Sequence, residues 1–278
     1  PLGIFRKQGG TMQAFKFQPV SRHLNRIILP CGVCVYLVQG THEAVLLDTG
    51  FGIGDLKGFV EQKVATPYQV WLSHGHLDHA GGSVQFETVY LSPADFALEK
   101  QHNVWQRRYD EILGGPGGAP EGFAPELLQP SRTEPYRPLE DNTVLDLGGV
   151  RVQVIPVSGH TAGMMVFLIP EDRIAIFGDA CGEMTLLKRE MLPIYAEALR
   201  KLQTWEGQFD TVLRNHGTFW SDKRILRDNL TLTEDILAGR DAVVPMQMMG
   251  VPGFAGRPLE HPGKYGNIFY AAAQDARW

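Results

Sequence analysis

The chain has 278 residues, of which 44% are hydrophobic and 21% charged, which is typical of one large globular domain or two small ones. Its net charge of −5 provides no basic footprint for nucleic acid and disfavours an anionic lipid surface. No apolar run reaches the roughly 18 residues of a membrane-spanning helix, so neither nucleic acid nor a membrane is an expected partner.

The N-terminal segment, residues 1–11, has no apolar stretch and no small-residue cleavage site, so it does not read as a signal peptide. Because Pro1 is not a natural start of translation, we expect residues 1–11 to be an artificial leader. The native chain is then expected to begin at Met12, just before a strand-like run at 14–17.

The chain contains three cysteines, Cys31, Cys34 and Cys181. This number argues against a disulfide framework and favours a reducing, cytoplasmic location. Cys31 and Cys34 form a C-x-x-C, which is compatible with a redox pair or half of a zinc knuckle. Since the pair lies in the strand-like run 31–38 and no second C-x-x-C exists, we interpret both as packed strand residues.

Short strands joined by turns are expected in the first third of the chain. In chain order these strands cover 22–29, 32–38, 43–48 and 69–72. A glycine-rich turn, 48–54, and a short helix, 55–62, precede the last of them. That last strand leads directly into a run of histidines.

The segment 92–141 has a different composition. Residues 93–100 favour a helix with Ser92 as its N-cap, whereas the glycine- and proline-rich stretch 114–120 cannot hold regular structure. We interpret 92–141 as a lid-like insertion in a single domain that covers 12–278.

The second half again alternates strands with helices. The expected elements are strands at 143–147 and 150–157, a β-hairpin at 164–177, a helix at 194–204, a strand at 211–213 and a helix at 222–237. The tail from about 243 shows little periodicity, and its Met246, Met248 and Met249 are interpreted as core residues, with the lining of a substrate pocket as the alternative. Strand-rich halves with interspersed helices predict two sheets packed face to face with helices outside.

Three of the nine histidines fall in the run His74-Gly75-His76-Leu77-Asp78-His79. Imidazole nitrogens and carboxylate oxygens are ligands that zinc-like metals accept. His74 and His76 are two residues apart on an extended segment, so both can face one ion. Asp78 and His79 come after the chain turns and can reach a second ion, so the run predicts a metal site.

Three further ligand candidates each follow an apolar strand: His160 in S-G-H-T-A-G, Asp179 in F-G-D-A and His216 in R-N-H-G. A loop at such a position projects its side chains from a sheet edge, where metal and substrate sites gather. The histidines that fit no ligand motif, interpreted as surface or core residues, are His23, His42, His102 and His261.

The order H-x-H-x-D-H, G-H-T-x-G, G-D and N-H-G, preceded by Asp48 in an L-L-D-T-G motif, resembles the metallo-β-lactamase-fold hydrolase superfamily over about residues 30–220. The resemblance implies an α+β, four-layer αβ/βα sandwich of two mixed sheets with helices outside. It also implies two divalent metal ions, with zinc expected and iron or manganese as alternatives. The implied ligands are His74, His76 and His160 for one ion, Asp78, His79 and His216 for the other, and Asp179 as the bridge.

The chemistry implied by this resemblance is hydrolysis. Two ions that share a water lower its pKa, so that a metal-bridging hydroxide attacks a carbonyl carbon or a phosphorus. Asp78 is the expected catalytic residue, since it would orient the hydroxide and pass a proton to the leaving group. Asp48 is expected to hold a metal ligand in place.

The identity of three residues narrows the choice of subgroup within this superfamily. Asp179 argues against dedicated β-lactamases, His76 against flavodiiron-type oxidoreductases, and Gly182 against quorum-quenching lactonases, which have tyrosine there. The glyoxalase-II-like group remains, which predicts cleavage of an ester, thioester or lactone bond in a small-molecule substrate, without an evident glutathione-binding basic pair.

Several alternatives to this function stay open. They are phosphodiester or β-lactam hydrolysis as a side activity, a mononuclear iron persulfide dioxygenase, and a non-catalytic small-molecule sensor. A homodimer is also compatible with the sequence.

Overall fold

The computed structural model describes residues 6–7, 10–11, 15–115 and 118–272. The chain divides into two compact units: unit 1 is 1–152 with 215–217, and unit 2 is 153–214 with 218–278. Met12, the expected native start, lies outside the described residues, and the prediction of one domain with a lid-like insertion stays a prediction. None of the described helices is long and apolar enough to cross a membrane.

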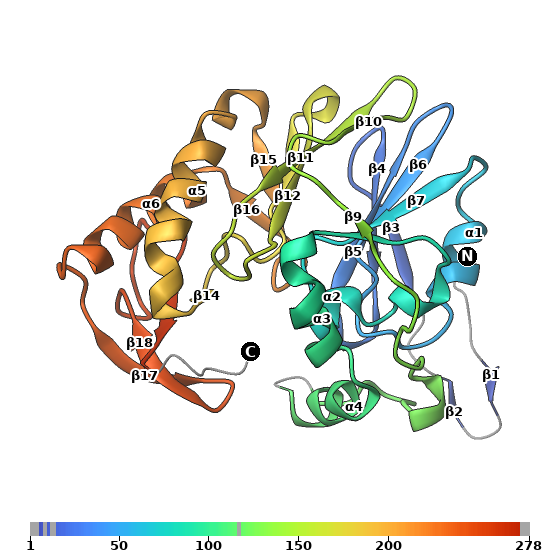
Figure 1. The fold of residues 1–278 in the computed structure, drawn as a ribbon, viewed down its shortest axis with the longest axis horizontal. Coiled ribbons are helices and arrows are strands. Elements are labelled where there is room, and N and C mark those ends of the chain that lie inside the picture. Colours follow the sequence, from blue (N-terminus) through green and yellow to red (C-terminus); the bar gives the residue numbers. More distant parts are fainter. Residues whose placement is uncertain (1–5, 8–9, 12–14, 116–117, 273–278) are drawn as a thin grey trace. The chain divides into compact units, whose positions relative to one another are not determined.

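Unit 1 is built on a mixed seven-stranded sheet in the order β3-β4-β5-β6-β7-β8-β9 (Figure 1). Its strands are β3 (Lys16–Pro19), β4 (Leu24–Ile28), β5 (Cys34–Gln39), β6 (Ala44–Leu47), β7 (Tyr68–Trp71), β8 (Tyr90–Leu91) and β9 (Arg137–Pro138). Neighbours from β3 to β6 are antiparallel and those from β6 to β9 parallel. The strands predicted between 22 and 72 are thereby confirmed as β4 to β7. A separate two-stranded ribbon pairs β1 (Arg6–Lys7) with β2 (Gly10–Thr11).

Helices cover one face of this sheet. Val35 of β5 and Leu46 of β6 pack in a buried cluster with Phe59 of α1 (Leu56–Glu61). The helix predicted at 55–62 is confirmed, and Asp55 caps it by accepting a main-chain hydrogen bond from its first turn at 2.8 Å. The short α2 (Leu77–Ala80) also reaches this cluster through its last residue.

The expected lid segment contains two helices, α3 (Phe96–His102) and α4 (Trp105–Gly114). The helix predicted at 93–100 is confirmed as a 3-10 turn at Pro93–Asp95 that continues into α3. The prediction that Ser92 caps it was wrong, because the Ser92 side chain makes no capping hydrogen bond.

Arg108 of α4 anchors this segment to unit 1. Its guanidinium is fully buried and donates to the carbonyl oxygens of Phe51 and Gly81, both at 2.9 Å. A third hydrogen bond reaches the carbonyl of Gln129 at 2.8 Å. Burial lowers the pKa of Arg108 to about 10, so the side chain stays cationic at neutral pH.

A second sheet has the order β10-β11-β12-β13-β15-β16; β10 and the start of β11 belong to unit 1, and the strands from the rest of β11 onward belong to unit 2. Its strands are β10 (Val144–Asp146), β11 (Arg151–Pro156), β12 (Met165–Ile169), β13 (Ile174–Ile176), β15 (Thr211–Leu213) and β16 (Trp220–Asp222). The predicted hairpin is confirmed, because β12 and β13 pair antiparallel across a short turn. That turn ends at Arg173, which has left-handed backbone.

The helices predicted at 194–204 and 222–237 are confirmed as α5 (Leu192–Gln203) and α6 (Arg224–Leu237), which lie side by side (Figure 1). Leu199 of α5 and Leu226 of α6 pack against Val166 of β12 in one buried cluster. Helices therefore cover a mixed sheet in unit 2 as well, which confirms the predicted fold class of mixed sheets with helices.

The tail is more regular than its sequence indicates. Three of its segments join a four-stranded sheet, β14-β19-β18-β17. The strands are β14 (Thr185–Leu187), β17 (Val244–Met248), β18 (Val251–Ala255) and β19 (Ile268–Ala271). They were not predicted, because β17 and β18 contain proline, which is uncommon inside strands, and β19 is buried on both faces and shows no alternation.

The three tail methionines divide between core and surface. Met246 and Met248 pack against the buried Phe269, as expected for core residues. Met249 is 56% exposed at the turn between β17 and β18, so its interpretation as a core residue was wrong.

Candidate metal centre

The histidine run follows β7 directly. His74 is fully buried and His76, at the N-terminus of α2, is 7% exposed. Their rings meet edge to face with centroids 4.7 Å apart, and a nitrogen of each lies within 4.8 Å of the other. Two imidazoles thus converge at the end of one strand.

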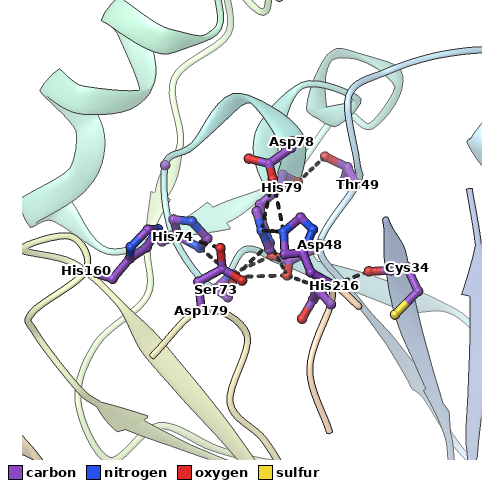
Figure 2. A network of polar contacts seen from close by, with 12 residues as sticks. Cys34, Asp48, Thr49, Ser73, His74, Asp78, His79, His160, Asp179 and His216 are labelled. Carbon is purple, nitrogen blue, oxygen red and sulfur yellow. Dashed lines mark hydrogen bonds and ion pairs between the residues drawn. The ribbon is translucent and has the colours of Figure 1, made fainter. Parts of the chain in front are cut away.

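A second group of donors gathers beside the first. Asp78, His79 and His216 each place a ligand atom within 4.8 Å of the others, and all three belong to unit 1 (Figure 2). The Nε2 atoms of His79 and His216 are 3.1 Å apart. An oxygen of Asp78 lies 3.0 Å from Nε2 of His216 and 3.6 Å from that of His79.

Asp48 connects to both groups, through His79 and through Ser73, the residue before His74. It directly follows β6, has a left-handed backbone, φ 69°, and is 1% exposed. Its Oδ1 accepts the main-chain N–H of Ser73 at 2.7 Å. Its Oδ2 lies 2.9 Å from the Ser73 hydroxyl, 3.0 Å from Nδ1 of His79 and 3.0 Å from the amide of Asn215. A buried carboxylate with four donors is well suited to fix the side chains around it.

These contacts determine which imidazole nitrogen carries the proton. A carboxylate only accepts, so Nδ1 of His79 carries the proton and its Nε2 keeps a lone pair. The single Ser73 hydroxyl proton goes to Asp48, so that oxygen accepts from Nδ1 of His74 at 3.0 Å. Nε2 of His74 therefore also carries a lone pair, which is the tautomer that metal binding requires.

Unit 2 holds the remaining two predicted ligands. Nε2 of His160 lies 3.7 Å from a carboxylate oxygen of Asp179. Nδ1 of His160 is 2.9 Å from the carbonyl oxygen of Leu186, which can only accept. His160 is therefore held in the same tautomer as His74 and His79, with the proton on Nδ1 and a lone pair on Nε2.

Four residues that the sequence did not assign to the site contact either a candidate ligand or a residue next to one. Ser73 and Asn215 directly precede His74 and His216, so adjacency was a usable signal. Asp95 accepts the main-chain N–H of Gly75 at 2.9 Å. His102 is buried, as a core histidine would be, and its ring stacks on that of His76 at 4.8 Å. No local sequence pattern indicates the roles of Asp95 and His102.

The donor chemistry fits divalent metal ions. Three histidines expose Nε2 lone pairs, and two Nε2 atoms face each other beside a carboxylate, an arrangement that a cation stabilises. The negative charge of Asp78 also acts on Glu111, whose pKa is raised first by burial and further by this carboxylate. Five of the seven predicted ligands lie in unit 1 and two in unit 2.

Comparisons with known proteins show which family the chain is similar to. A sequence profile of the Metallo-beta-lactamase superfamily matches residues 28–187. An uncharacterized protein of Mycobacterium leprae is 26% identical over 204 residues, which span 68% of this chain and 88% of that protein. The acyl-coenzyme A thioesterase MBLAC2 of Homo sapiens is 25% identical over 219 residues, which span 69% of this chain and 76% of the thioesterase.

Solved structures show the same fold. A metallo-beta-lactamase from Pontibacter korlensis has a TM-score of 0.53 at 18% identity and covers 84% of this chain and 100% of its own. An archaeal metallo-beta-lactamase superfamily protein from Sulfolobus tokodaii has a TM-score of 0.54 at 17% identity, over 83% of this chain and 92% of its own. At these identities the likeness shows the fold alone, and it confirms the fold class expected from the motifs.

Proposed function

The chain belongs to the metallo-β-lactamase superfamily, and on this basis we propose that it is a metal-dependent hydrolase of a thioester or related ester or lactone bond in a small molecule. Two divalent ions, expected to be zinc, are part of the proposal. The proposed ligands are His74, His76, Asp78, His79, His160, Asp179 and His216.

One observation carries the proposal. Asp78, His79 and His216 converge with two Nε2 atoms 3.1 Å apart and a carboxylate oxygen 3.0 Å from one of them. The Nδ1 proton of His79 is held by Asp48, so its Nε2 faces the group as a donor of electrons. A metal-ligating histidine almost always donates its other ring N–H to such an acceptor, as His79 does to Asp48.

The ions would supply Lewis acidity and lower the pKa of a water molecule. Asp78 would orient that water, accept its proton and return it to the leaving group, since its side chain is 20% exposed and reachable from solvent. Asp48 and Ser73 would keep His79 and His74 in the productive tautomer throughout.

A thioester is the favoured substrate class. The thioesterase relative is matched over most of its length, and the presence of Asp179 favours the glyoxalase-II-like group over dedicated β-lactamases. The thiol carrier is left open in this proposal. A homodimer, the exclusion of nucleic acid and a cytoplasmic location stay predictions from the sequence.

The proposal is tested by metal analysis together with a substrate panel. Zinc-replete protein should contain two metal equivalents and hydrolyse at least one acyl-coenzyme A, other thioester or lactone substrate. Asp78→Ala should lower kcat/KM by about 100-fold or more. The matched control is Asp110→Ala, which removes an exposed carboxylate from α4 and should leave the rate unchanged.

Other outcomes identify the competing functions. One iron per chain with oxygen consumption on a persulfide would indicate the dioxygenase. Stabilisation by a small molecule without turnover of any ester, lactone, β-lactam or phosphodiester would indicate a sensor. Either result, or full activity of Asp78→Ala, would reject the hydrolase.

A further inference from the structure

Asn215 is fully buried beside the candidate ligand His216. Residues 215–217 form the tip of the β15–β16 hairpin and belong to unit 1, although Arg214 and Thr218 on either side belong to unit 2. The base of the tip is closed by a 2.8 Å hydrogen bond from the Arg214 guanidinium to the Thr218 hydroxyl. The contacts of the tip itself therefore decide where His216 lies in unit 1.

Asn215 makes those contacts at the start of β5. Its main-chain oxygen accepts the N–H of Cys34 at 2.9 Å, and its side-chain amide donates to the carbonyl of Cys34 at 2.8 Å. The second amide proton goes to Oδ2 of Asp48 at 3.0 Å. Both partners of the amide only accept, so the orientation of the amide is fixed.

The amide orientation leaves one polar atom unsatisfied. Within the described residues, Oδ1 of Asn215 is buried and has no hydrogen-bond partner. Buried polar atoms without a partner are uncommon and call for an explanation. The two hydrogen bonds that the amide donates provide that explanation, since they join three separate segments of unit 1 at this one side chain.

The same Asp48 oxygen also accepts from Nδ1 of His79. Asn215 therefore connects the segment that carries His216 to the carboxylate that orients His79. We propose that Asn215 is a positioning residue for the ion bound by Asp78, His79 and His216, and that it sets the affinity for that ion. This inference rests on the proposed two-metal function.

The physical reason is the geometry of facing ligands. The Nε2 atoms of His79 and His216 are 3.1 Å apart, and a metal ion binds well only if both imidazoles keep a fixed separation and aim. Without the amide, the buried carbonyl of Cys34 and one lone pair of Asp48 lose a donor, and the tip is released from the carboxylate. Loss of such a supporting contact typically lowers metal affinity by about 10- to 100-fold.

The test compares Asn215→Leu with Asn229→Leu. Leucine keeps the approximate size of asparagine without its hydrogen bonds or any new charge. Asn229 is equally buried and also has two side-chain hydrogen bonds, to Ile225 and Thr185, but lies in α6. Zinc is titrated into each full-length variant against a chromophoric chelator, so that the two equivalents are resolved. The visible spectrum of the cobalt-substituted protein reports ligand geometry.

Asn215→Leu should weaken one zinc equivalent by about 10- to 100-fold and alter the cobalt spectrum, while Asn229→Leu keeps both equivalents at wild-type affinity. Equal losses in the two variants, or no loss in Asn215→Leu, would overturn the inference. Wild-type protein that binds no metal would reject the proposed function and the inference together. If Asn215→Leu does not fold, the smaller substitution Asn215→Ala is compared with Asn229→Ala in the same zinc titration and cobalt spectrum. The same outcomes then support or overturn the inference.

Discussion

The two units hold their candidate ligands in different ways. In unit 1, other side chains position the ligands: Asp48 contacts His79, Ser73 contacts His74, and Asn215 connects the His216 segment to Asp48. In unit 2, a main-chain carbonyl fixes His160. The ligand geometry of unit 1 is therefore open to single substitutions, whereas that of unit 2 depends on the path of a strand.

The largest expected effect is the protection of a thiol in each unit relative to the unfolded chain. Burial raises the pKa of Cys31 in unit 1 to about 11 and that of Cys181 in unit 2 to about 12, from 9.0. Only the thiolate reacts, and it forms only as the pH rises toward these values. Alkylation at pH 8 should thus be roughly 100-fold slower at Cys31 and 1,000-fold slower at Cys181 than in the unfolded chain.

Peptide mapping after iodoacetamide treatment, with and without urea, measures both rates. Fast labelling of native Cys31 would contradict its interpretation as a packed residue and would revive a redox role for the C-x-x-C.

Asp48→Asn should cause the next largest effect. The new amide would turn its N–H groups toward Nδ1 of His79, which would force the proton to Nε2 and remove the lone pair that binds metal. We expect zinc affinity and kcat/KM to fall by roughly 100-fold. Asp55→Asn, at the exposed cap of α1, is the control. Wild-type affinity in Asp48→Asn would show that this carboxylate does not set the tautomer.

Ser73→Ala should be milder. The hydroxyl joins Asp48 to Nδ1 of His74, and its loss leaves the carboxylate three other hydrogen bonds. Zinc affinity should drop about 10-fold, in one equivalent only. Ser83→Ala removes another buried hydroxyl of unit 1, one that contacts Tyr136 instead, and should bind zinc normally. Identical titrations for these two variants would exclude a role for Ser73.

The smallest effect is expected in unit 2. Leu186→Ala keeps the main-chain carbonyl that accepts from His160, so zinc affinity should stay within about twofold of wild type. The titration is the same as for the unit 1 variants. A tenfold loss would mean that side-chain packing of β14, rather than its carbonyl, positions His160, and the contrast between the units would disappear.

Local patterns predicted much of the fold. The strands β4 to β7 and the helices α5 and α6 were found because hydrophobic spacing and turn residues are properties of short stretches. The tail strands were missed, because β19 pairs with β14, more than eighty residues earlier in the chain. Pairing at that distance leaves no trace in local composition.

The candidate ligands could be named from local motifs, since metal binding demands particular side chains at tight spacing. The tautomers of His79 and His160 follow instead from the fold. These tautomers depend on partners far along the chain: Asp48 is 31 residues from His79, and Leu186 is 26 from His160. Asn215 reaches Asp48 across 167 residues. A proton on an imidazole is placed by its hydrogen-bond acceptor, and the fold alone brings that acceptor into contact.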